Sequence, residues 1–132
     1  FTTALDVAGG DYGNHVVDGI DLTPVFSSAA GSTSSREFLM HFPHSHRSSY
    51  FTAFRKEDWK LIYHYDKPSG PSDDKVELFN LSEDRNESFN LALSNPEKLR
   101  EMMQAMKTAL EESGAQLPLS KDGGEPHLPS LQ

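Results

Sequence analysis

The chain has 132 residues, a length that suits one domain with a modest hydrophobic core. Its formal net charge is -8, which argues against a nucleic-acid partner because phosphate binding requires clustered Lys and Arg. The absence of cysteine excludes disulfides, thiolate zinc sites and a cysteine nucleophile, and the apolar runs are too short for a membrane span.

The first 35 residues predict a short helix followed by loops. An apolar patch at residues 5–8 ends at Gly9 and Gly10, which stop the helix. The small polar residues 29–35 are typical of a linker. The chain does not begin with Met and opens inside an apolar, helix-like run. We therefore expect it to be the C-terminal piece of a larger enzyme.

Four short stretches in the middle of the chain predict β-strands. They are rich in apolar and aromatic residues and comprise residues 37–42, 50–55, 59–65 and 76–80. In the third stretch Trp59, Leu61, Tyr63 and Tyr65 fall on one face. The polar turn at residues 56–58 is so tight that the strands on either side of it must form an antiparallel hairpin.

A C-terminal helix is the clearest predicted element. Asn95 can cap it, Pro96 fits the first helical position, and Glu97 favours the positive end of the helix dipole. One apolar stripe repeats at three- and four-residue steps: Leu99, Met102, Met103, Met106, Ala109 and Leu110. Gly114 stands where a left-handed cap is expected.

Together these elements predict an α+β fold, with a four-stranded antiparallel sheet packed against one long C-terminal helix. The order of the strands within the sheet cannot be read from the sequence. The tail at residues 121–132 contains Pro and Gly and is predicted to be loosely ordered.

Three stretches, in this order, resemble the C-terminal end of the sulfatase family, and of arylsulfatase-like members in particular. Residues 2–9 followed by residues 18–22 look like the helix and D-G-x-D-L turn that end the family's catalytic domain. Residues 53–62 (AFRKEDWKLI) are similar to its A-x-R-x-G-D-W-K-L-I hairpin. Residues 77–92 resemble its E-L-Y-N-L-x-x-D-P-x-E-x-x-N-L-A signature.

The sequence departs from these patterns in three places. Glu57 stands where glycine is usual, which carries a cost if the turn requires a positive φ. Phe79 replaces the tyrosine, and Arg85-Asn86 replaces the proline-containing turn.

The resemblance implies that the parent protein hydrolyses sulfate esters of carbohydrates in the periplasm or outside the cell. On this basis residues 1–35 are the end of a missing catalytic domain with a linker, residues 36–115 are a C-terminal subdomain, and residues 116–132 are a loose tail. The family's formylglycine arises from a Cys/Ser-x-Pro-x-Arg segment, and its calcium lies close to that residue. Neither the segment nor a dense Asp/Asn cluster is present here. We therefore assign no catalytic or metal residue, expect the chain alone to be inactive, and expect the N-terminal catalytic domain to be its partner.

Three histidines within six residues, His41, His44 and His46, form the stretch that could contact a substrate. The resemblance implies a loop facing the cleft, in which any of them could hydrogen-bond a sugar or a sulfate. Ordinary surface or packing histidines are the main alternative. A metal site is a third, although no carboxylate lies next to them and Pro43 interrupts any regular spacing.

The other motif residues have a mainly structural interpretation. Trp59 can anchor the hairpin, and Arg55 and Asp58 can pair across its turn. Asp84, Glu87 and Asn90 are expected to fix a loop through side-chain bonds to backbone amides. The alternative to a sulfatase subdomain is a stand-alone module that binds a glycan or a protein.

Overall fold

The computed structural model describes residues 1–15, 17, 19–27, 37–44, 50–66, 74–119, 124 and 126–131. The chain divides into two compact units, Phe1–Ser34 and Ser35–Gln132, and each is described by itself.

The first unit contains two short helices, α1 (Thr2–Val7) and α2 (Thr23–Ser27). Gly9 has a φ of 67°, a left-handed conformation that only glycine adopts without cost, and α1 ends just before it. Thr3 joins the two helical segments, because its Oγ1 accepts a hydrogen bond from the Leu22 amide at 2.8 Å. Within this unit the predicted helix at the start of the chain is thus present.

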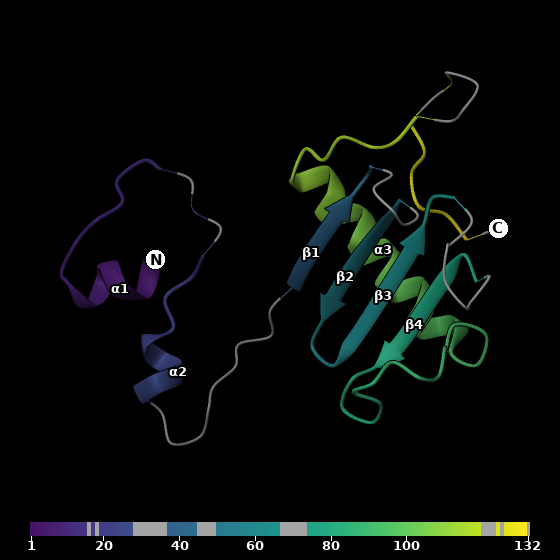
Figure 1. The fold of residues 1–132 in the computed structure, drawn as a ribbon, viewed down its shortest axis with the longest axis horizontal. Helices are drawn as coiled ribbons and strands as arrows, with labels where there is room; N and C mark the ends of the chain where they lie inside the picture. The colour runs from purple at the N-terminus through teal and green to yellow at the C-terminus, as the bar shows by residue number, and fades with distance from the viewer. Residues whose placement is uncertain are drawn as a thin grey trace. The chain divides into compact units, whose positions relative to one another are not determined.

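The second unit is a four-stranded antiparallel sheet with one helix (Figure 1). Its strands are β1 (Glu37–Phe42), β2 (Phe51–Lys56), β3 (Trp59–His64) and β4 (Val76–Asn80), and they lie side by side in chain order. The sheet and its C-terminal helix confirm the predicted α+β fold. The strand order, which sequence periodicity could not predict, is a simple meander.

The turn between β2 and β3 contains two residues, Glu57 and Asp58, because Lys56 pairs with Trp59. Glu57 has a φ of 55°. A positive φ at the first central residue of a two-residue hairpin turn is the situation in which glycine is preferred. The departure from the family pattern at this position therefore places an ordinary side chain in a left-handed conformation.

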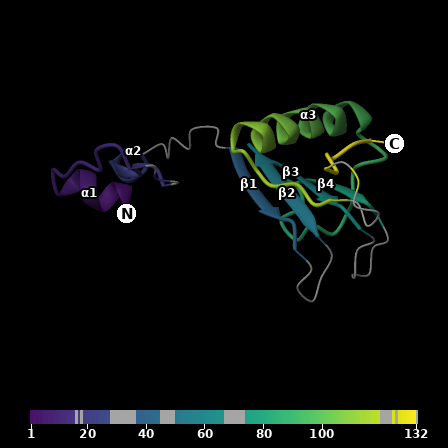
Figure 2. The ribbon, with the colours of Figure 1, turned by 90° about the horizontal axis from the view of Figure 1, so that it is seen from above.

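Helix α3 (Pro96–Glu112) lies across one face of the sheet (Figure 2). The alternation of side chains along β3 turns Leu61 and Tyr63 toward the helix, and both are fully buried. The helix contributes the stripe expected from its periodicity, with Met102, Met103, Met106 and Leu110 buried. Gly114 follows with a φ of 62°, in the left-handed region expected for a glycine past the helix end.

The chain after α3 makes defined contacts in its described residues. Leu119 and Pro126 form an isolated antiparallel bridge, and the His127 amide donates to the Pro118 carbonyl at 2.9 Å. Pro129 is among the fully buried side chains. The described part of this segment thus makes backbone contacts and buries one side chain, while Leu119, Leu128 and Leu131 stay exposed.

Candidate functional site

His41 lies on β1, with its ring on the face that α3 covers. Its Nδ1 is 2.8 Å from the Thr52 hydroxyl, and its Nε2 is 2.8 Å from the Gln116 carbonyl. A carbonyl only accepts, so Nε2 carries the proton and donates it to Gln116. In the neutral ring Nδ1 then accepts from the Thr52 hydroxyl. Both ring nitrogens are thus bonded within the fold.

A chain of hydroxyl groups continues from His41 into the core. The Tyr65 hydroxyl is 2.9 Å from the Thr52 hydroxyl, and Thr52 is fully buried. With the His41 ring neutral, Thr52 uses its proton toward His41, and Tyr65 donates to Thr52. Burial, the largest cause, raises the pKa of Tyr65 above its ordinary value, and the bond with Thr52 partly offsets this. Tyr65 therefore stays a neutral donor in this chain.

His44 differs from His41 in exposure. It follows the end of β1 and is exposed to solvent, with its ring edge-on to Phe42 at a centroid distance of 6.0 Å. His46 lies outside the described residues. Of the two described histidines of the predicted substrate loop, His44 is the one whose side chain faces solvent.

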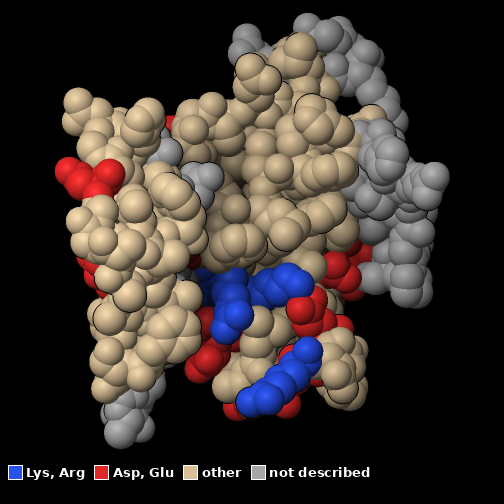
Figure 3. Space-filling view, turned by 60° about the vertical axis from the view of Figure 1, so that its left-hand side comes forward, with Lys and Arg blue, Asp and Glu red and all other residues tan. Residues whose placement is uncertain are grey.

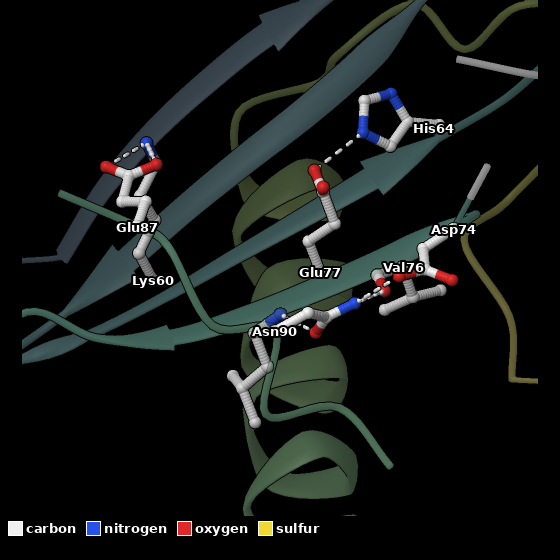
Figure 4. A network of polar contacts seen from close by, with 8 residues as sticks. Lys60, His64, Asp74, Val76, Glu77, Glu87 and Asn90 are labelled. Atoms are coloured by element: carbon white, nitrogen blue, oxygen red, sulfur yellow. Dashed lines mark hydrogen bonds and ion pairs between the residues drawn. The ribbon is translucent and has the colours of Figure 1, made fainter. Parts of the chain in front are cut away.

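Two sets of polar contacts, here called the polar network, connect the motif residues of the hairpin and of the following loop to the sheet (Figure 4). Lys60 Nζ lies 2.6 Å from Glu87 Oε2 and 2.7 Å from Oε1. Asn90 Oδ1 accepts from the Leu78 and Ala92 amides, each at 3.0 Å. The network fastens the loop after β4 to the sheet.

The predicted role of this loop is confirmed for two of its three residues. Asn90 bonds backbone amides, and Asp84 Oδ2 accepts from the Ser88 and Phe89 amides at 2.6 and 2.9 Å. The prediction was wrong for Glu87, whose carboxylate binds the Lys60 ammonium instead. Glu87 also has a φ of 55°, a left-handed conformation that is uncommon for a residue other than glycine.

Arg55 also differs from its predicted pairing. Within the described residues its Nε donates to the Glu57 carbonyl at 3.2 Å, rather than pairing with Asp58. The acceptor is the backbone carbonyl of Glu57, so the bond does not depend on which side chain stands at position 57.

Two histidines without any sequence signal have defined partners. His64 Nε2 lies 3.0 Å from Glu77 Oε2 on the face opposite α3. His127 Nε2 lies 3.2 Å from the Tyr63 hydroxyl, on the helix side. The second pair joins residues 64 positions apart, and no local pattern could have indicated it.

Basic side chains on the face drawn in Figure 3 lie among acidic ones. Lys56 bonds Glu37 at 2.7 Å and Lys98 bonds Glu101 at 2.6 Å, besides the Lys60 pair. These short ion pairs balance the positive charge locally. In the part of the chain that the structure describes, no group of three or more His, Cys, Asp or Glu side chains could hold a metal ion.

Among the described residues, no helix has the length and apolar character needed to cross a bilayer.

The sequence matches no protein-family model and no curated protein. The structure matches 28 solved chains. One is the structure of BT4656 in complex with its substrate, D-glucosamine-2-N,6-O-disulfate. The TM-score is 0.57 at 22% identity, and the match covers 85% of this chain and 23% of that one. The chain thus shares its fold with part of BT4656 and spans less than a quarter of its length.

Proposed function

We propose that this chain is the C-terminal subdomain of a sulfatase whose parent protein hydrolyses sulfate esters of carbohydrates. The observation that supports this most is the shared fold with BT4656, whose substrate is a disulfated glucosamine. The three sulfatase-like stretches of the sequence point in the same direction. Formylglycine and calcium would belong to the catalytic domain that precedes this subdomain.

The polar network accounts for two of these stretches physically. Lys60 of the hairpin motif binds Glu87 of the loop motif, and Asn90 of the loop motif binds the backbone of β4. The ion pair therefore joins the two motifs, and the Asn90 bonds hold the loop motif against its own strand. In this proposal the subdomain is a rigid scaffold that completes the fold and forms one wall of the substrate cleft.

His41, His44 and His46 are the proposed substrate-binding residues, and of the two that the structure describes, the exposed His44 is the better candidate for direct contact with a ligand. His41 binds Thr52 and Gln116, so contact with a sulfate would require it to give up one of these bonds. Its proposed contribution is to hold the end of β1, from which the His44 segment begins.

Sulfate release by two proteins tests the proposed activity. The first is this chain alone, and the second is the full product of the gene that encodes it. With D-glucosamine-2-N,6-O-disulfate as the probe, the full product should release sulfate and this chain should not, with or without calcium. Turnover by the chain alone, or none by the full product, would overturn the proposal.

The role of His44 is tested in the full product. A hydrogen bond to a charged group contributes about 1.5–3 kcal/mol, so His44→Ala should raise KM by roughly 10- to 100-fold. The matched control is His15→Ala, since His15 is also exposed, and it should leave KM unchanged. An unchanged KM in His44→Ala excludes substrate binding by that side chain.

Calorimetry with the same disulfated sugar tests the alternative, a stand-alone binding module. Tight binding by the chain alone, lost in His44→Ala, would favour the module over the subdomain.

A further inference from the structure

The two outer edges of the sheet are treated differently by the fold. At β4, Asn90 Nδ2 donates to the Val76 carbonyl at 3.0 Å, and its Oδ1 accepts from the Leu78 amide. The Leu91 amide donates to the Leu78 carbonyl at 2.8 Å. The asparagine side chain thus occupies backbone groups that a further strand would use, and the β4 edge is closed.

The β1 edge is open in the described part of the chain. The Tyr65 amide donates to the Tyr50 carbonyl, so Tyr50 bonds toward β3. Because the bonding direction alternates along an antiparallel strand, every second residue of β2 after Tyr50 also bonds toward β3. The remaining residues of β2, Phe51, Ala53 and Arg55, bond toward β1. Their partners there are Phe42, Met40 and Phe38.

The alternation within β1 then determines which backbone groups point outward. The amides and carbonyls of Glu37, Leu39 and His41 are directed away from β2. No described residue forms a backbone hydrogen bond with them. We call these three residues the outward set of β1.

Apolar side chains adjoin this open edge on the face opposite α3. Phe38 is 58% exposed and Met40 is 47% exposed, although both belong to a strand of the sheet. An edge strand with free backbone groups and exposed apolar side chains favours pairing with another strand, and natural sequences usually prevent this with a Lys or Pro. β1 contains neither.

We propose that the β1 edge binds the β1 edge of a second copy of this chain in a symmetric antiparallel pair. Centred on Leu39, the pairing brings Leu39 opposite its own copy and engages all three residues of the outward set in both copies. It also places Phe38 opposite Met40 of the second copy, so the exposed apolar side chains cover each other.

Charge favours the same register. A register centred on Glu37 would oppose two carboxylates, whereas centring on Leu39 keeps the two Glu37 side chains apart. The closed β4 edge stops the sheet from growing further. The assembly therefore ends as a two-fold dimer rather than a filament.

This inference does not depend on the proposed sulfatase function, and its test measures association only. Sedimentation of this chain over a concentration series reaching the millimolar range should show a monomer–dimer equilibrium. In the double variant F38K/M40K each lysine faces a lysine of the second copy, so the association constant should fall by at least about tenfold.

The control is F89K/L93K. Phe89 and Leu93 are 72% and 96% exposed and lie in the loop between β4 and α3, so the same change of charge there should leave the dimer intact. Both double variants change exposed positions, and equal thermal midpoints would verify that they fold. A monomer at every concentration, or equal weakening by both variants, overturns the proposal.

Amide hydrogen exchange separates edge pairing from simple contact between apolar side chains. The Met40 amide bonds β2 and should be protected at all concentrations. The Leu39 and His41 amides should gain protection only as the dimer forms. A dimer in which these two amides exchange as fast as in the monomer excludes pairing at the β1 edge.

Discussion

Glu57 and Glu87 share a φ of 55°, but the fold uses the two side chains differently. A left-handed conformation costs a non-glycine residue about 1–2 kcal/mol, and glycine adds about 0.5–1 kcal/mol of chain entropy to the cost of folding. Glu57→Gly should therefore raise the free energy of unfolding by about 0.5–1 kcal/mol. Chemical denaturation measures this change.

Two variants separate relief of backbone strain from loss of the carboxylate. Glu57→Ala removes the carboxylate but keeps Cβ, so it should not stabilise. Glu87→Gly relieves the same strain but removes the ion pair with Lys60. The side chains of Lys60 and Glu87 are only 26% and 32% exposed, so this variant should not stabilise either. Stabilisation by Glu57→Ala equal to that by Glu57→Gly would contradict the explanation from φ.

Tyr65 should make stability fall in alkaline solution. Its pKa is raised in the folded state by burial, so folded Tyr65 holds its proton at pH values where the unfolded chain has lost it. The stabilisation is complete below the ordinary tyrosine pKa of 10.0 and is lost as the pH rises from there through the folded pKa. A single proton gives at most about 1.4 kcal/mol per pH unit.

Denaturation at several pH values checks this with Tyr65→Phe. The variant lacks an ionisable group at this position, so its free energy of unfolding should depend less steeply on pH above 10.0 than that of the wild type. Parallel pH curves for the two proteins would show that Tyr65 does not carry the effect.

At the scale of elements, Asn90 acts as a substitute for a fifth strand beside β4. Its side chain makes bonds to the Leu78 and Ala92 amides and to the Val76 carbonyl. Asn90→Ala leaves these partly buried groups without partners, at about 1 kcal/mol for each lost bond. We expect the free energy of unfolding to fall by about 2–4 kcal/mol, measured by denaturant titration.

Asn95→Ala is a matched control for the same chemical change. Asn95 occupies the cap position of α3, as predicted, but its side chain makes no capping bond and instead donates to the Ser94 hydroxyl at 3.2 Å. Its removal should cost less than about 0.5 kcal/mol, the usual limit for a surface substitution. Equal losses in the two variants would argue against a special role for Asn90.

At the scale of the whole molecule, Ser35–Gln132 should fold without the first unit. The buried cluster of Ser35–Gln132 is formed entirely by residues of this second unit, including Phe54, Leu78 and Met106. A chain lacking residues 1–34 should therefore unfold cooperatively with an unchanged midpoint, as followed by circular dichroism. A lost or clearly lowered transition would mean that the first unit supports the second.

The sequence predicted those features that arise from neighbouring residues. The period of two in β3 and the three- and four-residue steps of α3 decide which side chains are buried, and both predictions were correct. The candidate site was less accessible to such reasoning. His41 and Gln116 lie 75 positions apart, and their bond depends on where the chain runs after α3. Periodicity contains no information about that path.

The meander has a consequence for the order in which the protein forms. Each strand pairs with its neighbour in the chain, so every pairing closes only a short loop and early pairing is fast. Helix α3, which covers the apolar face, is synthesised after all four strands. On the ribosome the sheet can therefore pair while Phe54 and Leu61 still face water. A nascent chain that stalls before Met102 would present this uncovered face and should be the form that chaperones bind most strongly.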